Sequence, residues 1–475
     1  MTGKTEAGLW PDFQRFNPKN LGKVIHRVIP IPEEELLQEL RQYIFPRLDF
    51  LAGAGNHTPF FLFEECYVET EWKDMISIHY INTSYEVKNT VLRIHLFSTC
   101  QVQESAYLGC FTMRTINETQ IMLSYIYPHW KNIKYIDKAL NIMTYKKTVH
   151  LNGVEIEFCT YPLFVQDNVV VACAQACLIS MSKYLHSKYD YNRIRIENIN
   201  NSYHSNKTKI FPSQGLLPTQ MLEILYSYNI PVGYQVYRNE NQNRSINFKE
   251  YIDYCVESAI PVLVGLIIET EENVQERHVI QIIGHSDVED GKKYVVYDDS
   301  GYYLKYMKQN GFVGCVEWET LSGDLKENKS FIIYPIHEKV YIPYDNFKKH
   351  MSDMWKKLEM DTLLESQEQG NKEDRILLLD NREVKNFLYD NIICQEGTEE
   401  EEGIRSEVRE EAIRLLQTAM PHYLWCCERS TSMGNLLFVA DPTYNRRTTK
   451  NIFLNRVPLI SNKQVSLLRY DGCDS

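Results

Sequence analysis

The chain has 475 residues, of which 44% are hydrophobic, and a formal net charge of −12. This length predicts two or three domains, and the apolar share excludes a disordered protein. The negative charge disfavours nucleic acid and anionic membranes as partners, because phosphate binding requires clustered lysine and arginine. We therefore expect a folded protein with neither of these partners.

The twelve cysteines are scattered and show none of the spacings of a zinc site, so we expect no metal and reduced thiols. The first residues, MTGKTEAGLWPDFQRF, lack the basic and apolar segments of a signal peptide. The longest apolar stretch, near 260–268, is too short to cross a bilayer. These features predict a cytoplasmic protein without membrane spans.

Residues 1–155 are expected to form an α+β region that carries no obvious chemistry. Helical apolar spacing predicts a helix over 33–44. Alternating patterns predict half-buried strands over 77–81 and 90–97, and a further strand is expected over 107–114.

Residues 156–340 show a sharper pattern, in which three helices precede three strands. Helices are predicted over 175–189, 218–228 and 247–258, and strands over 260–268, 278–284 and 293–297. Residues 341–475 are expected to be a second α+β region. Its helices are predicted over 347–360 and 406–418, its strands over 423–428 and 436–441, and an exposed acidic loop over 395–403.

Cys173 opens the first of the central helices. A thiol at a helix N-terminus faces unpaired backbone N–H groups and the positive end of the helix dipole. These groups stabilise the thiolate and lower the thiol pKa from about 8.5. Cys177, one turn further into the helix, is expected to be a core residue.

His278 begins an otherwise apolar segment, where an imidazole is available to pair with a thiolate. His285 is the alternative, but it lies seven residues further on, so a continuous strand would point it to the opposite face. Asp298 ends the next predicted strand. If the two strands form an antiparallel hairpin, Asp298 lies beside His278 and orients its ring, whereas Asp299 points away.

Taken in chain order, these residues and the segments around them resemble the papain-like cysteine peptidase superfamily. The resemblance is closest to the branch of double-glycine leader peptidases found on bacteriocin exporters. The resemblance rests on Gln166, Cys173-Ala-Gln-Ala-Cys-Leu178, Gly215-Leu216, Pro261-Val262, His278 and Asp298. It implies a bacterial α+β protein whose central domain packs a cysteine-bearing helix on an antiparallel sheet that carries histidine and aspartate. No Walker motif accompanies it, so export-coupled leader processing is not implied.

Two departures from the family pattern concern the residues around the nucleophile. Ala174 replaces the usual glycine, and the interval from Gln166 to Cys173 is one residue longer than usual. The family role of Gln166 is to donate to the oxyanion together with the backbone N–H of Cys173. The longer interval makes Asn168 an alternative donor and suggests that a regulatory protein partner gates the activity.

The resemblance implies acyl transfer through a thioester, without a cofactor. Cys173 attacks a carbonyl, His278 moves the proton and Asp298 holds His278. Hydrolysis of a peptide or isopeptide bond in a protein or peptide substrate is the expected reaction. The same triad serves acyltransferases of the transglutaminase kind and deamidases, and a third reading is a catalytically silent papain-like domain that binds a ligand.

Overall fold

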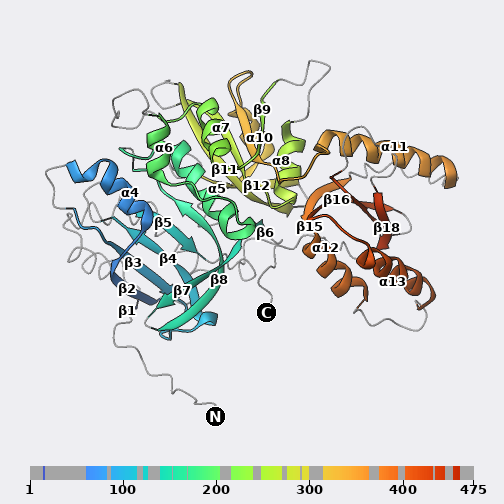
Figure 1. Cartoon of the computed structure of the whole chain (residues 1–475), viewed down its shortest axis with the longest axis horizontal. Coiled ribbons are helices and arrows are strands. Elements are labelled where there is room, and N and C mark those ends of the chain that lie inside the picture. Colours follow the sequence, from blue (N-terminus) through green and yellow to red (C-terminus); the bar gives the residue numbers. More distant parts are fainter. Residues whose placement is uncertain are drawn as a thin grey trace, which may run out of the picture. The chain divides into compact units, whose positions relative to one another are not determined.

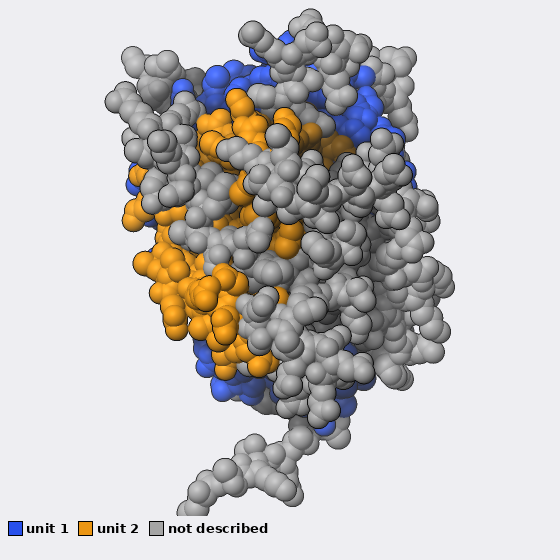
Figure 2. Space-filling view, turned by 90° about the vertical axis from the view of Figure 1, so that its right-hand side faces the viewer, with its two compact units in different colours: residues 1–245, 261–335, 470–475 blue, residues 246–260, 336–469 orange. Residues whose placement is uncertain are grey.

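The structure is a computed structural model that describes residues 14–15, 60–82, 87–114, 121–126, 140–151, 153–167, 169–203, 215–238, 248–269, 275–288, 291–298, 314–362, 374–393, 402–431, 434–443 and 453–459. The chain forms two compact units (Figure 2). Unit 1 comprises residues 1–245, 261–335 and 470–475, and unit 2 comprises 246–260 and 336–469. Both units combine helices with antiparallel sheets, which confirms the mixed α and β class expected from the sequence (Figure 1).

The first sheet of unit 1 has the strand order β1-β2-β3-β4-β5-β8-β7. Its strands are β1 (Gln14–Arg15), β2 (Phe60–Tyr67), β3 (Val91–Phe97), β4 (Tyr107–Met113), β5 (Ile121–Ile126), β7 (Tyr145–Leu151) and β8 (Val154–Phe164). The strands expected over 90–97 and 107–114 are thus present as β3 and β4. Both are buried along their whole length, so the expected half-burial of the first of them is wrong.

The second sheet of unit 1 has the order β13-β12-β11-β10-β14-β9, and β6 pairs with β11 beside this path. Its strands are β6 (Leu140–Ile142), β9 (Val232–Val236), β10 (Val262–Glu269), β11 (Gln275–Val288), β12 (Gly291–Tyr297), β13 (Gly314–Glu317) and β14 (Phe331–Pro335). The three strands predicted for the central region are β10, β11 and β12, and they form one continuous antiparallel ladder.

Helix α5 (Cys173–Tyr189) joins the two sheets, because it contacts β7 and β8 of the first and β11 of the second (Figure 1). Its central residues, including Ala176, Leu178 and Ile179, are fully buried. Unit 1 also contains α6 (Ile196–Tyr203), α7 (Pro218–Ser227) and α10 (Trp318–Gly323). The predicted helices over 175–189 and 218–228 correspond to α5 and α7.

Helix α4 (Thr70–Ile78) corrects one prediction, because it ends within the segment expected to be a strand over 77–81. A short turn of 3-10 helix, η2 (Tyr80–Asn82), follows it. The alternation in this segment is only five residues long, whereas burial of Trp72, Met75 and Ile76 at helical spacing stabilises the helix. The helix predicted over 33–44 lies outside the described residues.

Buried ion pairs connect α4 to α5. Lys183 Nζ lies 2.7 Å from Glu71 Oε1 and 3.8 Å from Glu69 Oε1. Burial raises the pKa of Glu69 to about 7, since Lys183 offsets only part of the desolvation and Glu71 opposes a second negative charge. Burial also acts to raise the pKa of Glu71, but Lys183, Glu69 and Arg193 outweigh it and lower that pKa.

Unit 2 has a four-stranded sheet of order β15-β16-β17-β18. Its strands are β15 (Arg375–Asp380), β16 (Tyr423–Thr431), β17 (Gly434–Ala440) and β18 (Phe453–Leu459). Its helices are α8 (Phe248–Glu257), α11 (Tyr344–Thr362), α12 (Asn381–Leu388) and α13 (Glu402–Gln417), with a π-helical turn, η5 (Tyr389–Ile393), after α12. Residues 402–403 of the expected acidic loop open α13, and 395–401 lie outside the described residues.

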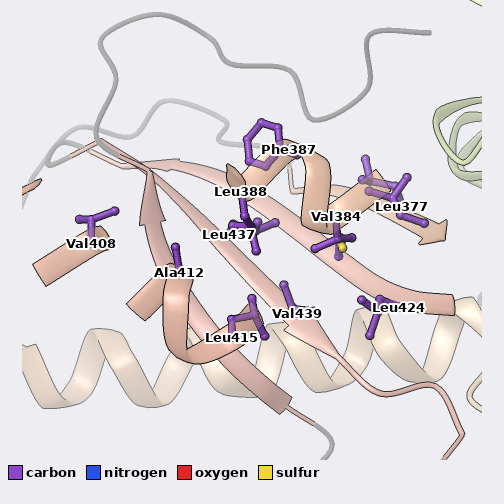
Figure 3. Close-up of a cluster of buried hydrophobic side chains, with 12 residues drawn as sticks. Leu377, Val384, Phe387, Leu388, Val408, Ala412, Leu415, Leu424, Leu437 and Val439 are labelled. Carbon is purple, nitrogen blue, oxygen red and sulfur yellow. The ribbon is translucent and has the colours of Figure 1, made fainter. Parts of the chain in front are cut away.

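Each face of this sheet carries helices. On one face, Val384 and Leu388 of α12 and Leu415 of α13 lie against strand residues such as Leu437 (Figure 3). On the other face, the ring of Trp425 is stacked on Phe347 of α11 at a centroid distance of 5.1 Å. Successive side chains along a strand point in opposite directions, so the same strands contribute apolar residues to both faces of the sheet.

Helix α8 belongs to unit 2 although its neighbours in sequence belong to unit 1. Arg375 on β15 donates from Nη2 to Glu257 Oε2 at 2.6 Å, and Leu378 N donates to Ser258 Oγ at 2.8 Å. The expected boundary at 155/156 falls inside β8, a strand of the first sheet. The three expected domains, 1–155, 156–340 and 341–475, stay a prediction about which parts fold independently.

Replacement of Leu437 by alanine tests the core of unit 2. Leu437 is fully buried, so Leu437→Ala should lower the free energy of unfolding by about 2–5 kcal/mol through lost burial and a residual cavity. Urea denaturation followed by circular dichroism measures the loss. Ile413→Ala on α13 is the control, because Ile413 is 37% exposed and the change should be below about 1 kcal/mol. Equal losses would contradict the described core.

Replacement of Glu69 by glutamine tests the buried carboxylates. The pKa of Glu69 is higher in the folded state than in the unfolded chain, so folding takes up protons and stability falls as the pH rises from about 4.5 to 7. We expect the melting temperature to fall less between about pH 5 and 8 in Glu69→Gln than in wild type. Glu65→Gln at an exposed position is the control. Parallel curves for all three proteins would contradict the raised pKa.

Candidate active site

Cys173 is the first residue of α5 and follows Ala172, whose backbone is extended. Its side chain is half-buried and so remains partly accessible. Cys177 is 1% exposed and its Sγ lies 3.5 Å from Val279 O, which confirms the expectation that it is a core residue.

His278 and Asp298 lie side by side, as the predicted hairpin requires. His278 Nε2 and Asp298 Oδ1 are 2.8 Å apart, and their side chains are 6% and 1% exposed. Gln281 pairs with Tyr297, so continuing the register places Asp298 opposite Ile280 and diagonally across from His278 on the same face. Strand β11 begins at Gln275, so His278 is its fourth residue and not its first.

The surroundings of His278 favour the imidazolium form. Burial acts to lower the pKa of His278, but the hydrogen bonds with Asp298 and Cys173 and the negative charge of both partners outweigh it. The net effect raises the pKa of His278 well above its ordinary value of 6.5. His278 Nε2 is occupied by Asp298, and Cys173 is a second hydrogen-bond partner of the His278 side chain. The three side chains can therefore form a thiolate, an imidazolium and an orienting carboxylate.

His285 does not point to the opposite face of β11, so the prediction made from its seven-residue spacing to His278 is wrong. Ile282 pairs with Val296 and Gly284 with Val295, so Ile283 is an extra residue in a β-bulge. The bulge reverses the alternation and returns His285 to the face of His278. The strand does not end at Gly284, because β11 continues to Val288 and Gly284 pairs with Ile142 of β6. His285 remains seven residues along the strand from His278.

The loop between β8 and α5 contains Gln166 and is organised by Asp167, a residue that the sequence reasoning missed. Asp167 Oδ1 accepts hydrogen bonds from the N–H groups of Val169, Val170 and Val171 at 3.1, 2.9 and 2.7 Å. Asp167 is 2% exposed, and Gln166 beside it is half-buried. An aspartate just before a short apolar run and a helix is typical of such backbone capping, and that was the available signal.

Two alternative residues, Asn168 and Asp299, lie outside the described residues, so they stay alternatives. Within the described ranges, no group of three or more His, Cys, Asp or Glu side chains is arranged to hold a metal ion. No helix in those ranges combines the length and apolarity that a membrane span needs. Cys159 is disulfide-bonded, which departs from the expectation that the thiols are reduced.

Comparison with known proteins adds no assignment. No protein-family model matches the chain, and no curated protein matches it. The geometry of the residues around Cys173 is therefore the basis for a functional proposal.

Alkylation of Cys173 by iodoacetamide tests the thiolate–imidazolium pair. We expect labelling at about pH 6 to be fast in wild type and slow in His278→Ala, where the rate should follow an ordinary thiol with a pKa near 8.5. Asp298→Asn should fall between them, because loss of the carboxylate removes a cause of the raised pKa of His278. Peptide mass spectrometry follows each cysteine, with exposed Cys66 as the internal reference. A Cys173 profile that matches Cys66 in wild type would exclude the pair.

Proposed function

We propose that the chain is a papain-like thiol hydrolase that cleaves peptide or isopeptide bonds through Cys173, His278 and Asp298. The observation that carries the proposal is the buried His278–Asp298 hydrogen bond together with the contact of His278 with Cys173 at the start of α5. In this arrangement the imidazole is held by a carboxylate on one side and meets a thiol on the other, as nucleophilic catalysis requires.

The proposed reaction begins with attack of the Cys173 thiolate on a carbonyl carbon. His278 donates its proton to the leaving amine, which departs and leaves a thioester on Cys173. His278, now neutral, takes a proton from water as that water attacks the thioester and releases the acid. Gln166 and the N–H of Cys173 are the proposed oxyanion donors in both steps.

Transfer to an amine, and deamidation of a side-chain amide, use the same thioester and are the first alternatives. A silent ligand-binding domain is less well supported, because such a domain has no need of a buried carboxylate on the imidazole that faces its cysteine. The cytoplasmic location, the bacterial origin, the peptide or protein substrate and the regulatory partner stay predictions. They rest on the sequence and not on the geometry around Cys173.

Incubation of the full chain with a proteome-derived peptide library in oxygen-18 water tests the proposal and separates the alternatives. Hydrolysis should place oxygen-18 on new C-terminal carboxyl groups, which mass spectrometry detects. Deamidation would place it on a side-chain carboxyl group, and acyl transfer would join an amine without incorporating the isotope. Cys173→Ala should lower product formation by at least about a thousandfold.

Cys177→Ala is the matched control, because it removes a thiol from the same helix without touching the proposed triad. It should retain the product pattern of wild type. Absence of every covalent product in wild type would contradict the hydrolase proposal and favour a ligand-binding domain.

A further inference from the structure

Both sides of Gln166 are held by residues from the first part of the chain. Arg114 Nη2 donates to Val165 O at 2.8 Å, and Val165 N donates to Met122 O at 2.8 Å. On the other side, Tyr80 OH donates to Asp167 Oδ2 at 2.9 Å. Arg114 is fully buried, and Tyr80 is 5% exposed. The residues on each side of Gln166, Val165 through its backbone and Asp167 through its side chain, are therefore held by groups that come from 40 or more residues earlier in the sequence.

The same loop leaves few groups that can face a substrate carbonyl. The N–H groups of Val169, Val170 and Val171 all donate to Asp167 Oδ1. The N–H of Ala172 donates to Gln175 Oε1 at 2.9 Å. The N–H of Cys173 is thus the first in the segment that none of these hydrogen bonds uses. This pattern favours the Cys173 N–H as the backbone donor, and the family pattern makes the Gln166 side chain its proposed partner.

Asp167 explains how Gln166 and the Cys173 N–H can act together although the interval between these two residues is one residue longer than in the family pattern. One of its carboxylate oxygens accepts hydrogen bonds from three consecutive N–H groups, which closes the backbone into a turn before α5, and the other oxygen accepts from the Tyr80 hydroxyl. The ring of Tyr80 packs against those of Trp72 and His79 at centroid distances of 5.6 and 5.0 Å, and these contacts restrict its movement. The turn is therefore anchored outside the helix that it precedes.

We propose that Tyr80, Arg114 and Asp167 are positioning residues that hold Gln166 and the Cys173 N–H in register as an oxyanion hole. The inference rests on the proposed hydrolase function and adds to it a structural role for the first part of the chain. In this role that part of the chain completes the proposed active site.

Two reactions of Cys173 separate this role from support of the fold. Acetylation by p-nitrophenyl acetate forms a C–S bond to the acetyl carbon and expels p-nitrophenolate, and it passes through a tetrahedral oxyanion. Alkylation by iodoacetamide forms a C–S bond and expels iodide without an oxyanion. Both rates are measured on the full chain by peptide mass spectrometry of Cys173, with the release of p-nitrophenolate as a second readout.

Tyr80→Phe removes only the hydroxyl that holds Asp167. We expect it to slow acetylation of Cys173 by about tenfold or more, while alkylation stays within about twofold of wild type. Gln166→Ala removes a proposed donor itself and should slow acetylation by about 10²–10³-fold. Tyr226→Phe is the matched control, since it also removes a hydroxyl that donates to the protein, at 3.3 Å to Val232 O, but far from this loop in sequence. Its two rates should equal those of wild type.

The outcomes distinguish the two proposals. If Gln166→Ala slows acetylation but Tyr80→Phe does not, the positioning role is wrong and the hydrolase proposal stands. If Tyr80→Phe slows both reactions equally, the tyrosine supports the nucleophile or the fold in general, and the positioning role is again wrong. If Cys173 in wild type is acetylated no faster than the exposed Cys66, the hydrolase proposal fails and the inference fails with it.

Discussion

The buried hydrogen bond between His278 and Asp298 makes the strictest demand on the fold of unit 1. A charged pair removed from water is tolerated only when each partner is compensated, and removal of one partner typically costs about 3–5 kcal/mol. The antiparallel register of β11 and β12 supplies the geometry, and Cys173 at the start of α5 is a second hydrogen-bond partner of the imidazole. The register of β11 and β12 and the position of α5 must therefore both fit the contacts of one imidazole.

The helix that carries Cys173 is held from two directions. Strands of both sheets contact it, and Lys183 near its middle is paired with carboxylates that adjoin α4. The loop before it is anchored to Tyr80 and Arg114. Every one of these contacts lies within unit 1, and most involve the first 165 residues. Cys173 is therefore placed by the first sheet as much as by the sheet that carries His278.

The sequence predicted the parts of the site that local pattern determines. Helical spacing located α5 with Cys173 at its start, and strand alternation with a hairpin placed Asp298 beside His278. His285 was predicted to face away from His278, and this prediction was wrong because strand alternation does not reveal the bulge at Ile283. The anchors at Tyr80 and Arg114 could not be predicted, since their partners lie 87 and 51 residues away in the chain and no local pattern encodes such contacts. The oxyanion role of Gln166 stays a prediction.

The membership of α8 in unit 2 has a consequence for synthesis on the ribosome. The helix is made before the sheet that it packs against, and its partner Arg375 follows Glu257 by 118 residues. At a synthesis rate of roughly 5–20 residues per second, β15 is made on the order of ten seconds after α8. During that time the strands of unit 1 that follow α8 are themselves being made. The order of translation thus favours formation of the two sheets of unit 1 before the C-terminal sheet that packs against α8 is available.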